Sequence, residues 1–100
     1  MEYRRADSVK GLLQKEISLL LRKVKDPRIG FVTITGVEVT DDLRHAKVYV
    51  SVMGAESMRT QTMEGLHSAA GFIRRELGRV LTLRRIPEIV FRYDESVERG

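Results

Sequence analysis

Positively charged side chains gather in two stretches of this 100-residue chain, and they are the residues best suited to bind a partner. The guanidinium of Arg can hold a phosphate through two parallel hydrogen bonds, whereas the ammonium of Lys acts as a compact point charge. Both stretches could contact a polyanion such as RNA, although any exposed cation can equally be a solvated surface residue. The candidate RNA contacts are Arg22, Lys23, Lys25, Arg28, Arg74, Arg75, Arg79, Arg84 and Arg85.

The charge balance favours the same class of partner. The chain carries a formal net charge of +4, with 18 Lys and Arg against 14 Asp and Glu. Residues 1–30 and 71–100 hold the basic excess, and residues 31–70 are acidic on balance. A one-sided positive face would attract a polyanion. A mildly basic, solvated surface without a partner is the alternative.

The sequence offers little that could catalyse a reaction. Asp41, Asp42 and His45 lie around one predicted turn, and His67 is the other imidazole. Aspartates in turns usually accept hydrogen bonds from nearby backbone amides. The chain has no cysteine, which excludes disulfides and thiolate sites. No nucleophile–base pair or metal-ligand spacing is evident, so we expect a non-enzyme without metal or cofactor.

The first group of cations lies at and after the end of a predicted amphipathic helix over residues 7–24. Asp7 or Ser8 is expected to cap its start, and Pro27 disfavours helix at the preceding residue. The apolar side chains recur at spacings of three and four residues. These are Val9, Leu12, Leu13, Ile17, Leu20, Leu21 and Val24.

Two strands are predicted next, joined as a hairpin. Residues 31–40 are rich in β-branched side chains, and Gly36 is expected to mark a bulge. Residues 41–44 form the turn. Residues 45–53 then alternate between apolar and polar side chains, which is typical of an antiparallel strand with one buried face.

The second group of cations lies on and after another predicted helix, which begins at Glu56 or Ser57. The small residues Ala69, Ala70 and Gly71 interrupt it and are expected to bend it into two helices. A straight helix would point Phe72 away from the core, whereas a kink would let this ring pack inward. A connection over 82–88 then leads to a third strand, Ile89–Tyr93.

These elements predict a two-layer α+β domain, with three strands and the helices on one face of the sheet. No apolar run reaches the length of a membrane span, and the first residues lack a signal peptide. We therefore expect a cytoplasmic protein that does not bind a membrane. Residues 1–94 are expected to form the domain, and residues 95–100 a polar C-terminal tail.

Several short motifs, taken in order, resemble the ribosome-binding factor A family of bacterial small-subunit assembly proteins. They are Lys25-Asp26-Pro27-Arg28, Val32-Thr33-Ile34-Thr35, Ala46-Lys47-Val48-Tyr49-Val50-Ser51, Ala69-x-Gly71, Leu83-Arg84, Pro87-Glu88-Ile89 and Asp94-Glu95-Ser96. The resemblance implies a type II KH fold of order αββααβ. It also implies that an Ala-x-Gly kink, matched by Ala69, Ala70 and Gly71, replaces the GXXG loop that clamps RNA in other KH domains.

The resemblance further implies a non-catalytic function on the ribosome. Family members bind the free 30S subunit and 16S rRNA, assist late maturation including 5′-end processing, and support growth in the cold. They need no cofactor or small-molecule substrate, and we expect a monomer. Family members commonly continue beyond the Asp94-Glu95-Ser96 region, so this chain is either a short member or a truncated one.

Two other functions stay open at this point. The chain could be a generic KH-type module for single-stranded RNA, or a protein-interaction module that does not bind RNA. The few aromatic residues, three Tyr and three Phe without Trp, favour recognition of RNA shape and phosphates over base stacking.

Overall fold

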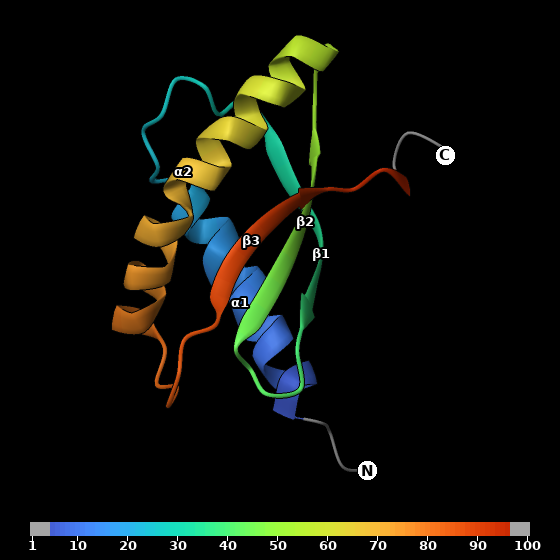
Figure 1. Cartoon of the computed structure of the whole chain (residues 1–100). Coiled ribbons are helices and arrows are strands. Elements are labelled where there is room, and N and C mark those ends of the chain that lie inside the picture. Colours follow the sequence, from blue (N-terminus) through green and yellow to red (C-terminus); the bar gives the residue numbers. More distant parts are fainter. Residues whose placement is uncertain (1–4, 97–100) are drawn as a thin grey trace.

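The computed structural model describes residues 5–96 as two helices and three strands (Figure 1). The elements are α1 Arg5–Leu21, β1 Val32–Val39, β2 His45–Val52, α2 Glu56–Val80 and β3 Glu88–Tyr93. The predicted strands agree with these bounds to within one residue at each end. Part of the predicted polar tail, residues 97–100, lies outside the described residues. Asp7 and Ser8 lie within α1 rather than before it, so the predicted cap is wrong.

The sheet has the order β1-β2-β3. Strands β1 and β2 pair antiparallel, and β2 and β3 pair parallel, so α2 provides the crossover that parallel neighbours require. The register shifts between Ile34 and Gly36, which leaves Thr35 as the extra residue of a bulge. The bulge predicted around Gly36 is therefore confirmed.

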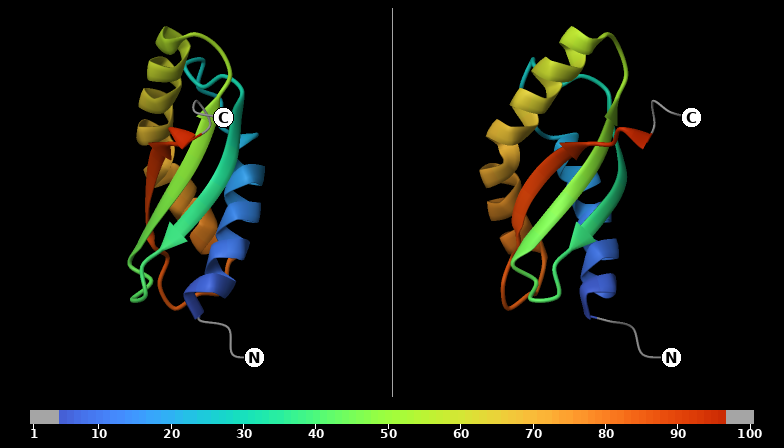
Figure 2. Two further views of the ribbon diagram at one scale, coloured as in Figure 1. Left: turned by 90° about the vertical axis from the view of Figure 1, so that its right-hand side faces the viewer. Right: turned by 45° about the vertical axis from the view of Figure 1, so that its right-hand side comes forward.

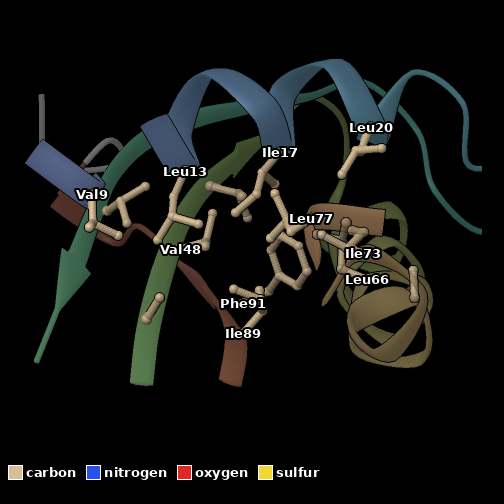
Figure 3. Close-up of a cluster of buried hydrophobic side chains, with 14 residues drawn as sticks. Val9, Leu13, Ile17, Leu20, Val48, Leu66, Ile73, Leu77, Ile89 and Phe91 are labelled. Atoms are coloured by element: carbon tan, nitrogen blue, oxygen red, sulfur yellow. The ribbon is translucent and has the colours of Figure 1, made fainter. Parts of the chain in front are cut away.

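Both helices cover the same face of the sheet and enclose one core (Figures 2 and 3). Strand β2 contributes Ala46, Val48 and Val50, which are fully buried, as its alternating sequence predicts. Leu12 is exposed, in contrast to its predicted place on the apolar face of α1. The two-layer α+β architecture is confirmed. The helices bury Val9, Leu13, Ile17 and Leu20 from α1 and Leu66, Ala69, Ile73 and Leu77 from α2.

Helix α2 runs unbroken for 25 residues, so the predicted division into two helices is wrong and the observed order is αββαβ. Its ribbon curves along its course without losing a turn (Figure 2). The reason is that Ala is the strongest helix former, and a single Gly costs only about 1 kcal/mol relative to Ala. With helix-forming sequence on both sides, cooperative hydrogen bonding continues across residues 69–71.

Candidate nucleic-acid interface

The structure places the predicted RNA contacts in two separate groups, and all of them are exposed. The first group lies in the connection between α1 and β1 and is called the loop cluster. The second lies on the C-terminal half of α2 and in the connection to β3, and is called the helix cluster. The loop cluster is Arg22, Lys23, Lys25 and Arg28, and the helix cluster is Arg74, Arg75, Arg79, Arg84 and Arg85.

The two clusters extend to different ends of the molecule. The α1–β1 connection runs beside α2, whereas the α2–β3 connection lies at the opposite end of the molecule (Figure 1). There, Arg84 and Arg85 line a small hollow together with Asp42 and Leu43 of the β1–β2 turn. Exposed cations such as Lys10 on α1 and Lys47 on the open sheet face lie outside both clusters. Positive charge is therefore spread more widely than a single face.

The loop cluster is held in place by two residues of α2 that sequence reasoning missed. The Thr62 hydroxyl is fully buried; it donates a hydrogen bond to the Arg28 carbonyl at 3.2 Å and accepts one from the Gly30 amide at 3.3 Å. At Gly65, an added Cβ would lie 2.6 Å from Cγ1 of Ile29. The loop therefore packs so closely on α2 that a side chain at position 65 would collide with it.

One member of the loop cluster is engaged within the loop itself. Arg28 donates from Nη2 to Oδ2 of Asp26 at 2.7 Å, and its backbone amide donates to Oδ1 at 2.9 Å. The side-chain hydrogen bond from Arg28 is the main reason why the pKa of Asp26 lies below its ordinary value. Arg28 therefore offsets the Asp26 charge, and Arg22, Lys23 and Lys25 carry the net positive charge of the loop.

Two of the arginines in the helix cluster also have partners inside the molecule. Arg74 donates from Nε and Nη2 to the Ile86 carbonyl at 3.3 and 3.2 Å, which ties α2 to the connection that precedes β3. Arg79 pairs with Glu76 on the same helix at 3.4 Å. Arg75, Arg84 and Arg85 have no hydrogen-bond or ion-pair partner among residues 5–96.

A pocket of about 390 Å³ opens where the loop cluster meets the middle of α2. Phe72 lines it with 39% of its surface exposed, so the ring points outward, as predicted for a straight helix. The small residues on that helix do not act as one unit: Ala69 is buried, whereas Gly71 is exposed and an added Cβ there would meet nothing within 4 Å. The remaining pocket walls are Lys23, Val24, Lys25, Asp26, Ser68 and Ala69.

The acidic turn has the geometry of ordinary turn chemistry. Oδ1 of Asp42 accepts hydrogen bonds from the Thr40 hydroxyl at 2.6 Å and the Arg44 amide at 3.0 Å. The Thr40 hydrogen bond is the main cause that lowers the pKa of Asp42. The imidazole of His67 lies elsewhere, with Nε2 3.1 Å from the Phe91 carbonyl.

The described part of the chain, residues 5–96, has the features of neither a metal site nor a membrane span. No group of three or more His, Cys, Asp or Glu that could hold a metal ion occurs there. Neither described helix is both long and apolar enough to cross a membrane.

Comparison with known proteins points to one family. The family model described as Ribosome-binding factor A matches residues 5–100. A ribosome-binding factor A from Halothermothrix orenii is 55% identical over 101 residues, which cover 100% of this chain and 83% of the relative.

Solved structures agree with this match. The solution NMR structure of a candidate ribosome binding factor A from Thermotoga maritima superposes with a TM-score of 0.82 and 37% identity, over 98% of this chain and 95% of that one. A Thermus thermophilus ribosome binding factor A, fitted as a homology model into a cryo-EM map of a 30S complex, shares the fold. Its TM-score is 0.72 at 22% identity, over 86% of this chain and 91% of that one. The chain belongs to the ribosome-binding factor A family.

Proposed function

We propose that this chain binds the free 30S ribosomal subunit and docks on its folded 16S rRNA. The observation that carries the proposal is the family match over residues 5–100. The Thermus thermophilus relative, which was fitted into a map of a 30S complex, supports the choice of subunit. The exposed cations without internal partners supply the electrostatic means of docking.

The phosphate contacts are assigned unequally among the predicted residues. Arg22, Lys23, Lys25, Arg75, Arg84 and Arg85 have no partner within residues 5–96 and are free to meet phosphates. Arg28, Arg74 and Arg79 already bond to groups of their own chain, so they mainly hold the surface in shape. Contacts of this kind position a protein on RNA and read its shape rather than its sequence.

Sedimentation with purified ribosomal particles tests the proposal. We expect the chain to migrate with 30S subunits, and not with 50S or 70S particles, and to dissociate as the salt concentration rises. A chain that ends after Asp94 should behave in the same way if the domain is complete there. Binding that is insensitive to salt, or equal binding to 50S particles, would contradict RNA docking on the small subunit.

The role in the cell is proposed as non-catalytic assistance to late 30S maturation, including processing of the 16S rRNA 5′ end, with its greatest importance in the cold. A strain depleted of the chain should accumulate 16S rRNA with unprocessed 5′ ends and should grow slowly at low temperature. Complementation by the wild-type chain should restore both. A depleted strain with normally processed 5′ ends would contradict this role.

A type II KH relationship is proposed for the fold, with α2 in place of the usual helix pair and Ala69, Ala70 and Gly71 at its bend. The curved ribbon of α2 supports this assignment (Figure 2). Short single-stranded oligonucleotides should bind poorly, because the sequence has no GXXG loop between the positions of the two helices. Tight binding of such oligonucleotides would favour the generic KH module instead.

A further inference from the structure

The pocket between the α1–β1 connection and the middle of α2 combines two features that phosphate docking alone does not need. It offers an exposed aromatic ring, Phe72, and it lies between apolar walls provided by Val24 and Ala69. It is an open hollow of about 390 Å³ on the surface and not an enclosed cavity. A surface that only met phosphates would need neither a hollow nor an aromatic ring.

The charges at the rim of this pocket select an anionic occupant. Lys23 and Lys25 line the pocket and have no hydrogen-bond or ion-pair partner within the described chain. Asp26 also lines it, but its carboxylate is bonded to the side chain and the backbone amide of Arg28. The net charge facing the occupant is therefore positive, and the hydroxyl of Ser68 adds a neutral donor and acceptor.

We propose that this pocket holds one unpaired nucleotide of the RNA, with its base against Phe72 and its phosphate near Lys23 and Lys25. The inference rests on the proposed function and names the ligand of one part of that surface. A nucleotide combines a flat π face with a phosphate, which are the two partners that an aromatic ring beside cations can use together. An acidic peptide would use the lysines and leave the ring unmatched.

The nucleotide must be unpaired, because both faces of a base inside a duplex are already stacked on its neighbours. Proteins reach base faces in RNA mainly at loops, bulges and ends. A pocket for one nucleotide adds selectivity to a larger phosphate-docking surface. A pocket for one nucleotide is therefore compatible with the weak binding that we expect for isolated short oligonucleotides.

The first test compares substitutions of the ring in binding to 30S subunits. Phe72→Leu keeps an apolar side chain but removes the π face, and we expect affinity to fall about fivefold or more with an unchanged salt slope. Phe72→Trp should bind at least as tightly as the wild type. Phe31→Leu is the matched control, since Phe31 is 84% exposed and does not line this pocket, and it should bind as the wild type does.

The second test examines the free protein by NMR titration with AMP, and with inorganic phosphate as the reference. AMP should shift the amide signals of Lys23, Lys25, Ser68 and Phe72, and phosphate alone should affect chiefly the lysines. Phe72→Leu should reduce the AMP response to that of phosphate. This measurement does not depend on the ribosome.

Two results would overturn the inference. One is 30S affinity of Phe72→Leu within twofold of the wild type, and the other is an AMP response that equals the phosphate response. If the wild-type chain does not bind 30S subunits at all, the proposed function fails and the NMR comparison alone decides the pocket. If the wild type binds and Phe72→Leu binds equally well, the pocket fails and the proposed function stands.

Discussion

The loop cluster and the helix cluster are both rich in cations, but the fold uses them differently. In the loop cluster the internal pair, Arg28 with Asp26, is local, and it leaves Lys23 and Lys25 free at the edge of a pocket. In the helix cluster, Arg74 joins two elements by bonding to the Ile86 carbonyl, and Arg79 pairs along its own helix. On this basis we propose the RNA contacts among the cations that their own chain leaves unbonded.

The largest expected effect comes from disrupting the packing of the loop cluster against α2. Gly65→Ala should lower the free energy of unfolding by about 1–3 kcal/mol, because the added methyl group would overlap the Ile29 side chain. Urea denaturation measures this change. Gly71→Ala is the matched control on the same helix, and a loss of stability there as large as at Gly65 would contradict the docking of the loop.

Neutralising two unbonded cations of the loop cluster and two bonded cations of the helix cluster tests whether internal bonding decides which cations meet RNA. Lys23→Gln with Lys25→Gln should weaken 30S binding about tenfold and reduce the slope of log affinity against log salt by about 1–2. Arg74→Gln with Arg79→Gln should change that slope little. It should lower stability by about 1 kcal/mol through loss of the hydrogen bonds to Ile86.

The slopes come from binding titrations at several salt concentrations, and the stabilities from urea denaturation of the same variants. If the Arg74 and Arg79 variant altered the salt slope and the Lys23 and Lys25 variant did not, the assignment of phosphate contacts to unbonded cations would be wrong.

A smaller effect is expected at Gly71, which lies on α2 between the two clusters. Gly71→Ala should raise the free energy of unfolding by about 0.5–1 kcal/mol, because the position is helical and open. Thermal denaturation measures the change. If the variant is more stable but binds 30S subunits less well, curvature of α2 matters for docking. Destabilisation would show that glycine is required by the local backbone.

The smallest expected effect is the pH dependence of the Asp26–Arg28 pair. The pKa of Asp26 is lowered in the folded chain, so the unfolded chain binds more protons at acidic pH. The pair therefore stabilises the fold above the ordinary aspartate pKa of 3.8, and this contribution disappears as the pH falls through the lower folded value. Asp26→Asn should flatten the acid limb of a stability–pH curve slightly.

The same flattening should follow from Arg28→Met, and adding Asp26→Asn to it should have little further effect. Additive effects of the two substitutions would show that the side chains do not act as a pair. If both single variants kept the acid limb of the wild-type stability–pH curve, the local role assigned to Arg28 would be contradicted.

Much of the fold could be predicted from local patterns. The alternation of Ala46, Val48 and Val50 identified the buried face of β2, and the apolar spacing of α1 placed Leu13 and Ile17 in the core. The prediction that residues 69–71 divide the helix was wrong because small residues permit a helix to bend but do not force it to end. A long helix loses little by running through them.

The site was less predictable, because it depends on partners that are distant in sequence. Thr62 contacts Arg28 and Gly30 across more than 30 positions, and no periodicity reports such a bond. Gly65 did carry a signal, since a glycine inside a helix indicates either a cost or a close approach. Gly71 carries the same signal although its position is open, so the signal alone does not distinguish it from the crowded Gly65.

The bonds from α2 to β3 have a consequence for how these molecules meet one another. His67 bonds to the carbonyl oxygen of Phe91 within β3, and Arg74 bonds to that of Ile86, two residues before β3 begins. An edge strand with unpaired backbone groups is a template on which a second polypeptide can add as a further strand. Because side chains of α2 already occupy these two acceptors, fewer backbone groups at this edge are open to an added strand.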